Sequence, residues 1–190
     1  MHSIEPFWKW RDYYTAEEDE KSPFYGREYS EFEFSDKIYN YYIHPQWDNF
    51  GSETLYLKLL YVDYKKGGAI IEFIGEWNDC TQNDIMFLKR EIVGVLIDNG
   101  ISKFALIGEN ILQFFGDRNE YYEEWYDDIK DNDGWIMAIN FREHIIDEMY
   151  QSNIHHYVNI NEKYNDINWR QYKPHHLIAY LDDLLIKIID

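Results

Sequence analysis

Cys80 and His144 are the residues whose type and position most favour chemistry. Cys80 follows the apolar run 69–77 and precedes a predicted helix, where α/β sheets often bind ligands and where a thiol can act as a nucleophile with a lowered pKa. His144 stands three and four residues before Asp147 and Glu148, a spacing that puts three metal-binding groups on one helix face. For Cys80 the structural alternative is a small buried residue at a turn, and for His144 it is an exposed polar helix face. We favour the structural alternative in both cases.

The remaining candidates for chemistry carry weaker signals. His155-His156 and His175-His176 are adjacent pairs, and we expect neighbouring side chains to point apart, which favours surface or capping roles over a metal site. The acidic residues of segment 123–128 lack the alternation and glycine of a calcium-binding loop. The sequence also has no glycine-rich phosphate loop, nucleophile elbow or zinc-ligand spacing. We therefore predict no catalytic residue, no metal and no cofactor.

The composition limits the partners. The chain has 190 residues, with 36 acidic and 18 basic side chains and a formal net charge of -18, so its field repels nucleic-acid phosphates. A protein partner is the expectation, and the negative field would attract a basic one. The single cysteine, Cys80, allows no intrachain disulfide, residues 1–14 lack a signal-peptide core, and no long apolar run occurs. These features predict a cytoplasmic protein without a membrane segment.

The elements that would position these residues begin at Leu55. Runs 55–64 and 69–77 predict two antiparallel strands joined by the turn residues 65–68. A helix is predicted from about Gln82 to Asp98, capped by Asp79 or Thr81 and stopped by Asn99-Gly100. Its buried stripe consists of Ile85, Leu88, Ile92 and Leu96.

Further along, two crossovers are predicted. Segment 103–108 is typical of a buried strand, which makes strand, helix and strand a parallel unit of the α/β class. Residues 117–133 suggest an irregular helix with a solvated acidic face, which could alternatively mimic DNA or dock a basic protein. Strand 135–140, helix 141–152 with Ile145, Ile146 and Met149 inward, and a last strand 156–160 complete the pattern.

Both ends of the chain differ from this core. Residues 1–54 interleave acidic and aromatic side chains without lasting periodicity, and we expect them to pack on the main domain, residues 55–190, with short strands near 29–34 and 38–43. A closing helix beginning at Pro174 either caps the sheet or forms a homodimer. Its apolar stripe is Leu177, Ile178, Leu181, Leu184, Leu185 and Ile188.

The order of hairpin, helix, strand, helix, strand, helix and strand resembles the STAS domain, the fold of anti-sigma factor antagonists and of the cytoplasmic tails of sulfate transporters. Two stretches carry the resemblance, 71–77 (IEFIGEW) with the nearby Thr81, and 134–158, from GWIMAIN through Ile154 to Tyr157-Val158. The resemblance covers about residues 55–160. Regulatory members carry an Asp-Ser-Ser/Thr-Gly stretch whose Ser is phosphorylated, whereas here segment 108–117 has neither Ser nor Thr.

The resemblance implies a divergent STAS-like protein that acts by protein interaction without catalysis. We predict a partner surface formed by the 77–79 turn and a loop at 108–117, and exposure of Phe114 or Phe115 would favour it. Its candidate residues are Trp77, Asp79, Glu109, Asn110, Phe114 and Asp117. The alternative is a small-molecule-binding protein or hydrolase with a pocket near Cys80 or His144.

Overall fold

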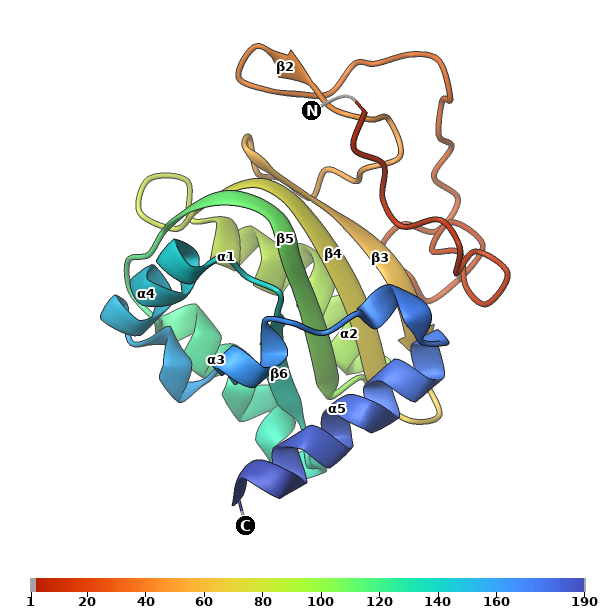
Figure 1. Cartoon of the computed structure of the whole chain (residues 1–190). Helices are drawn as coiled ribbons and strands as arrows, with labels where there is room; N and C mark the ends of the chain where they lie inside the picture. Colours follow the sequence, from red (N-terminus) through yellow and green to blue (C-terminus); the bar gives the residue numbers. More distant parts are fainter. Residues whose placement is uncertain (1–2, 190) are drawn as a thin grey trace.

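The computed structural model describes residues 3–189, with side chains up to residue 185, and it is built on a four-stranded mixed sheet (Figure 1). The strands β3 (Leu55–Asp63), β4 (Gly68–Asn78), β5 (Lys103–Phe115) and β6 (Trp135–Ile139) follow one another across the sheet in that order. β3 is antiparallel to β4, whereas β5 and β6 run parallel to it. The predicted α/β class, with a mixed sheet and helices packed on it, is confirmed.

The predicted helix after the hairpin is one continuous rod of three parts. These are α1 (Asp84–Phe87), a π-helical segment (Leu88–Val93) and α2 (Gly94–Asp98). The rod ends at Asn99-Gly100, as predicted, with Gly100 at a φ of 90°. Each residue of the predicted stripe is buried: Ile85, Leu88, Ile92 and Leu96.

The first difference from the expected fold concerns segment 108–117, which is not a loop. β5 continues to Phe115 and stays parallel to β4 as far as Asn78. Register shifts near Gly75 let both strands bend together while the pairing continues. The surface expected on a flexible loop is therefore built on the end of a long strand.

The second difference concerns the expected last strand at 156–160. A 3-10 turn, Ile154–His156, occupies its start, and a single parallel bridge joins Met137 to Asn159. Asn159 also donates its side-chain amide to the Ile136 carbonyl, so this segment is held to β6 by one residue and not by a ladder. The helix before it, α4 (Glu143–Gln151), lies where predicted, with Ile145 and Met149 buried and Ile146 half-buried.

The acidic segment forms α3 (Glu120–Ile129), followed by a 3-10 turn, Lys130–Asn132. Its apolar face is buried, but its acidic face is not simply solvated. The Lys89 ammonium lies 2.8 Å from Asp128 and 3.3 Å from Glu124, and Lys89 itself is buried. Part of the acidic face therefore holds α3 against the preceding helical rod.

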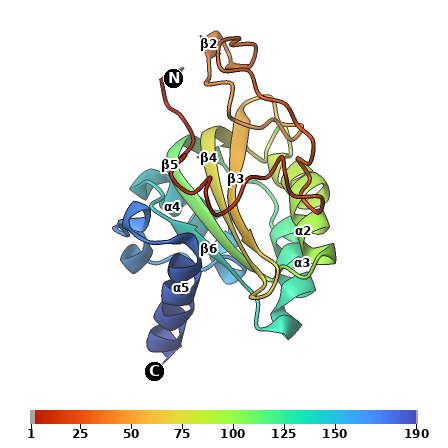
Figure 2. The ribbon, with the colours of Figure 1, turned by 90° about the vertical axis from the view of Figure 1, so that its right-hand side faces the viewer.

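Helices cover both faces of the sheet (Figure 2). The rod α1–α2 and α3 pack on one face, and α5 (Pro174–Ile189) packs on the other through Leu177, Ile178 and Leu181. Two further 3-10 turns, Glu162–Tyr164 and Trp169–Gln171, precede α5. The closing helix thus caps its own sheet; Leu184 and Leu185 are half-buried, and the Ile188 side chain lies outside the described side chains. Within the described residues, none of the helices has the length and apolar character needed to cross a membrane.

The segment before Leu55 runs along the outer edge of β3, where Figures 1 and 2 both show it. Its regular structure is limited to a hairpin of β1 (Lys37–Ile38) and β2 (Tyr41–Tyr42), so the strand expected near 29–34 is absent within this described part. Asp48 bridges Leu57 of β3 with two backbone hydrogen bonds of 2.7 and 3.1 Å. The segment therefore covers a sheet edge that would otherwise be open to pairing with other chains.

Candidate functional site

The candidate site is the edge of the sheet at which β4 and β5 end. Ligands of open α/β sheets commonly bind outside the carboxyl ends of parallel strands, because loops from neighbouring strands meet there. Here the turn after β4 is tied to the end of β5, since the backbone amides of Asp79 and Cys80 donate to the Phe115 carbonyl at 3.0 and 3.3 Å. The two predicted segments are therefore brought together.

Asp79 organises this edge from the inside. Its buried carboxylate accepts hydrogen bonds from the Tyr122 hydroxyl at 2.7 Å, the Trp77 indole at 2.9 Å and the Ile85 backbone amide at 2.9 Å. Asp79 thus caps the helical rod from six residues away, whereas the predicted Thr81 capping box does not form. Burial raises the pKa of Asp79 to about 7, although its three donors oppose the shift.

Three of the predicted partner-binding residues belong to the core. Trp77 is 2% exposed, Phe114 is 4% exposed and the Asp79 carboxylate is enclosed by its donors. The Trp77 ring contacts the Phe114 ring, with centroids 5.8 Å apart. The rings of Trp77 and Phe114 cannot touch a partner directly in this conformation, so their part in the predicted surface is corrected to support from beneath, whereas Asp79, 5% exposed, borders a hollow at this edge.

Glu109 and Asn110 lie away from that edge, inside β5 and both half-buried. Glu109 accepts hydrogen bonds from the Trp169 indole and the Asn140 amide, both at 2.8 Å, and its carboxylate lies 2.7 Å from Arg170. Burial alone would raise the pKa of Glu109, but these donors and the Arg170 charge outweigh burial and hold it below its usual value. Glu109 therefore fixes the loop before α5 to the sheet.

Of the six predicted residues, Asp117 is the exposed one, and it helps to line a shallow hollow of about 490 Å³. Phe115, two residues earlier, is 42% exposed. Sequence analysis did not place Arg118, Glu120 and Tyr121 at this site, because only the turn of the chain into α3 brings them there. The hollow is lined by Asp79, Cys80, Thr81, Asn83, Asp117, Arg118, Glu120 and Tyr121.

Cys80 lies in this hollow with its side chain exposed, which corrects the expectation of a small buried residue at the turn. The Cys80 thiol donates to the Gly116 carbonyl at 2.8 Å. Its pKa is raised, by partial burial first and then by the nearby carboxylates of Asp117, Asp79 and others, so the reactive thiolate is disfavoured. The hypothesis of a lowered thiol pKa is therefore wrong. Cys80 also stands four residues before the helix begins at Asp84, so it is not at the helix N-terminus.

The histidine candidates do not form a metal site. The Nε2 atom of His144 lies 3.0 Å from the Leu112 carbonyl, which engages the imidazole with β5. The rings of His155 and His156 lie 4.2 Å apart, and the other histidine pair is similarly close, so the expectation that neighbouring rings point apart was wrong. Among the described residues, no group of three or more potential ligands is arranged to hold a metal ion.

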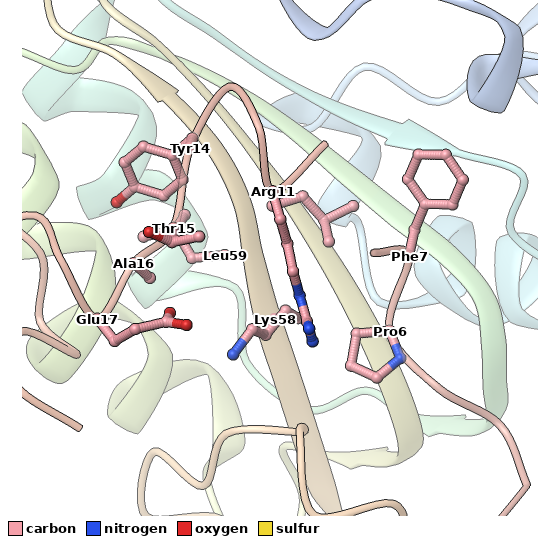
Figure 3. A pocket seen from close by; sticks show the side chains of 10 residues that line it. Pro6, Phe7, Arg11, Tyr14, Thr15, Ala16, Glu17, Lys58 and Leu59 are labelled. Carbon is pink, nitrogen blue, oxygen red and sulfur yellow. The ribbon is translucent and has the colours of Figure 1, made fainter. Parts of the chain in front are cut away.

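A second set of buried charges escaped the sequence analysis. Lys58, in the middle of β3, is buried with its ammonium 3.2 Å from Asp48 and 3.7 Å from the Tyr29 ring centre. Burial lowers the pKa of Lys58, although Asp48 opposes the shift. The adjoining cavity holds about 20 Å³, room for roughly one water molecule, and Figure 3 shows Arg11 and Glu17 beside Lys58 there. The sequence signal that could have indicated this site is Lys58 itself, the one charged residue within the apolar run 55–62.

These features define an α/β protein with a four-stranded mixed sheet and helices on both of its faces. Among solved structures, the chain is similar to the anti-sigma factor antagonist SpoIIAA in its unphosphorylated form. The two share 10% sequence identity with a TM-score of 0.41, and the match covers 56% of this chain and 90% of the other. SpoIIAA is an anti-sigma factor antagonist, the class of protein that the sequence resemblance named. No family model matches the chain, and no curated protein sequence matches it.

Proposed function

We propose that the protein is a non-catalytic, regulatory interaction module of the cytoplasm whose partner protein binds at the carboxyl edge of β4 and β5. The observation that carries the proposal is the exposed ring of Phe115, two residues before Asp117 of the hollow, on a strand end packed over the rings of Trp77 and Phe114. Exposed aromatic rings on a rigid support are typical of the residues that dominate protein interfaces, because they bury large apolar areas at low entropic cost.

The charges around the hollow favour a partner segment with basic residues. Asp117 and Glu120 are exposed on its rim, with Arg118 as the one basic side chain of the lining. The net charge of -18 adds a long-range attraction for a positively charged partner. A partner with an apolar side chain for Phe115 and a neighbouring Lys or Arg would satisfy both features.

The alternative, a small-molecule-binding protein or hydrolase, has weaker support. A hydrolase at Cys80 would need a thiolate, and the neighbouring carboxylates oppose its formation. The His144 ring is engaged with the Leu112 carbonyl, away from the thiol's own hydrogen bond. The hollow is also shallow, whereas small-molecule sites enclose most of their ligand.

The proposal is tested by site-directed photo-crosslinking. The full chain carries p-benzoylphenylalanine in place of Phe115 or, as the matched control, in place of Tyr150, which is 44% exposed elsewhere on the surface. After irradiation in an extract of the cells that make the protein, we expect one defined protein adduct from position 115. Asp117→Lys should reduce its yield at least about twofold through charge repulsion, and Cys80→Ser should leave it unchanged.

Two results would exclude this surface. One is equal labelling from positions 115 and 150, and the other is an adduct that persists at full yield after the charge reversal at Asp117. Loss of the adduct in Cys80→Ser alone would instead favour a reactive thiol and therefore the alternative function.

A further inference from the structure

A second surface lies on the aromatic arm, which we define as residues 31–42 around the β1–β2 hairpin. Its four most exposed rings are those of Phe32, exposed by 86%, Tyr39 by 62%, Tyr41 by 65% and Tyr42 by 51%. Figure 1 shows the hairpin projecting beyond the end of the sheet at which β3 begins. Isolated exposed rings need no explanation, but several within one short segment mark an interaction site.

The arm is anchored to the body and is not a loose appendage. Ile38 is 1% exposed and packs with Ile43, Trp47, Tyr56 and Ile74 in a separate small core. The rings of the arm are thus presented on a buried base. An interface built on such a base loses less conformational entropy on binding than a flexible tail would.

Tyr39 holds the most specific geometry of the arm. Its hydroxyl donates to the Oε2 atom of Glu76 at 2.7 Å, which places an exposed ring beside a carboxylate near the end of β4. Tyr39 also has a φ of 54°, in the left-handed region that a bulky residue rarely adopts. The turn therefore accepts a conformational cost while presenting this ring next to Glu76.

The same pairing of ring and carboxylate binds a cation inside this molecule. The Tyr29 hydroxyl donates to Asp48 at 2.6 Å, and the Lys58 ammonium lies 3.7 Å from the Tyr29 ring centre and 3.2 Å from Asp48. A ring face and a carboxylate attract one cation together, the ring through its quadrupole and the carboxylate through its charge. Among the described residues, no cation stacks on the four exposed rings of the arm.

We propose that the aromatic arm binds a Lys or Arg side chain of a partner protein, with the cation over the face of the Tyr39 ring and beside the Glu76 carboxylate. The other exposed rings would cover the neighbouring residues of the same basic segment. The arm itself contains three acidic residues, Glu31, Glu33 and Asp36, against one basic residue, Lys37. A second copy of this chain is a poor occupant, because two molecules of charge -18 repel each other. This site adjoins the Phe115 edge, because Glu76 lies two residues before Asn78, which pairs with Phe115.

The test uses a defined probe, the peptide acetyl-Gly-Arg-Gly-Arg-Gly-Arg-Gly-amide, and its matched control in which citrulline replaces each arginine. Citrulline keeps the shape of arginine but removes its charge. The isotopically labelled full chain is titrated with each peptide and followed by NMR. We expect the largest shifts in residues 31–42 and at Glu76 with the arginine peptide, and none with the citrulline peptide.

Three variants separate the proposed contact from general charge attraction. Tyr39→Leu and Glu76→Gln should each weaken peptide binding about three- to fivefold, the size expected for losing one exposed cation–π contact or one charge pair. Tyr25→Leu removes another tyrosine, 57% exposed and outside the arm, and should leave binding unchanged. Unchanged signals from β5 and β6 show that each variant is folded.

Some outcomes would overturn the proposal. Shifts spread over the acidic face of α3 would identify general charge attraction, and equal shifts with the citrulline peptide would exclude a cation site. Equal weakening by all three variants would remove the special role of Tyr39 and Glu76. The peptide titration reports on Tyr39 and Glu76, whereas the crosslinking reports on position 115, so failure of one proposal can be told from failure of the other.

Discussion

Glu72 and Glu109 lie on neighbouring strands, yet burial and hydrogen bonding move their pKa values in opposite directions. Glu72 is 1% exposed, and it accepts the backbone N–H of Phe7 at 2.9 Å with Arg170 no closer than 3.8 Å. Burial therefore dominates and raises the pKa of Glu72 to about 7. Glu109 has three close donors, including Arg170 at 2.7 Å, and its pKa is lowered. The two pKa values therefore differ because Glu109 has three close donors, including the Arg170 guanidinium, whereas Glu72 has one close donor and a more distant Arg170.

This difference predicts a pH dependence for Glu72. The folded state holds the Glu72 proton more tightly than the unfolded state, so this stabilisation is complete below the unfolded pKa of 4.5 and is lost as the pH rises through about 7. The shift corresponds to roughly 3 kcal/mol. Urea unfolding from pH 4.5 to 8 should show a fall in unfolding free energy, part of which also comes from Asp79. In Glu72→Gln, this fall should be smaller by about 3 kcal/mol.

The matched variant Glu109→Gln should behave oppositely. Because the pKa of Glu109 is lowered, its stabilisation is present above the unfolded pKa and is lost only on acidification. Glu109→Gln should therefore cost about 2 kcal/mol at pH 7, through weaker charge-assisted hydrogen bonds, without changing the slope between pH 5 and 8. An unchanged slope in Glu72→Gln would show that Glu72 is charged throughout and that its burial is offset in another way.

At the scale of elements, Gly75 allows β4 to change register and pass close to its neighbours just before the turn that leads into the helical rod. Gly75 has a φ of 118°, and a Cβ atom there would lie 2.1 Å from the Thr54 carbonyl oxygen and 2.7 Å from Ile38. The register shifts of β4 occur on both sides of this residue. Only glycine permits both the backbone angle and the close approach.

Gly75→Ala should accordingly lower the unfolding free energy by about 4 kcal/mol, the sum of a backbone penalty and an overlap with Thr54 and Ile38. Gly100→Ala is the matched control, because Gly100 has a φ of 90° but no heavy atom within 4 Å of the position of a new Cβ. It should cost only about 1–2 kcal/mol, the backbone penalty alone. Urea denaturation of both variants measures the difference, and equal costs would show that the sheet yields at Gly75.

Local patterns predicted the elements that have regular apolar spacing. The hairpin strands and the strand at Trp135 are apolar runs, and the stripe of the helical rod has helical spacing; these predictions were confirmed. β5 was cut short because Glu109 and Asn110 interrupt its apolar run. Glu109 is satisfied by Trp169, 60 residues away, and no local pattern can indicate such a partner.

The candidate site was harder to predict than the fold, for a related reason. Sequence analysis correctly brought the 77–79 turn to the end of β5, because parallel neighbours share an edge. It could not tell which side chains point outward. Trp77 and Phe114 turned inward while Phe115 turned outward, and that choice depends on the alternation set by a register that includes bulges.

At the scale of the whole molecule, residues 7–10 and residues 169–172, from opposite parts of the sequence, pack together on one face of the sheet. Phe7, Trp10 and Trp169 form edge-to-face ring contacts with centroids between 4.9 and 5.4 Å apart. The Trp10 indole also donates to the Tyr172 carbonyl at 3.1 Å. The segment before Leu55 and the loop before α5 therefore share one hydrophobic cluster with β4 to β6.

This packing predicts that residues 1–54 unfold together with residues 55–190. Trp10→Ala should lower the unfolding free energy by about 3–5 kcal/mol, the usual cost of removing a buried tryptophan. The control Trp8→Ala removes a ring that is 56% exposed and should change the unfolding free energy by less than about 0.5 kcal/mol. The measurement is urea unfolding followed by tryptophan fluorescence and by amide hydrogen exchange in β5. Because β5 lies in the middle of the sheet, its exchange reports opening of the whole molecule.

If Trp10→Ala speeds exchange only in the first 54 residues and leaves β5 unchanged, the N-terminal segment opens by itself. The aromatic arm would then be held by a detachable segment, and binding at Tyr39 would be coupled to docking of that segment. If β5 is destabilised to the same extent as the N-terminal segment, the arm and the Phe115 edge belong to one cooperative structure, and a ligand at either surface stabilises both.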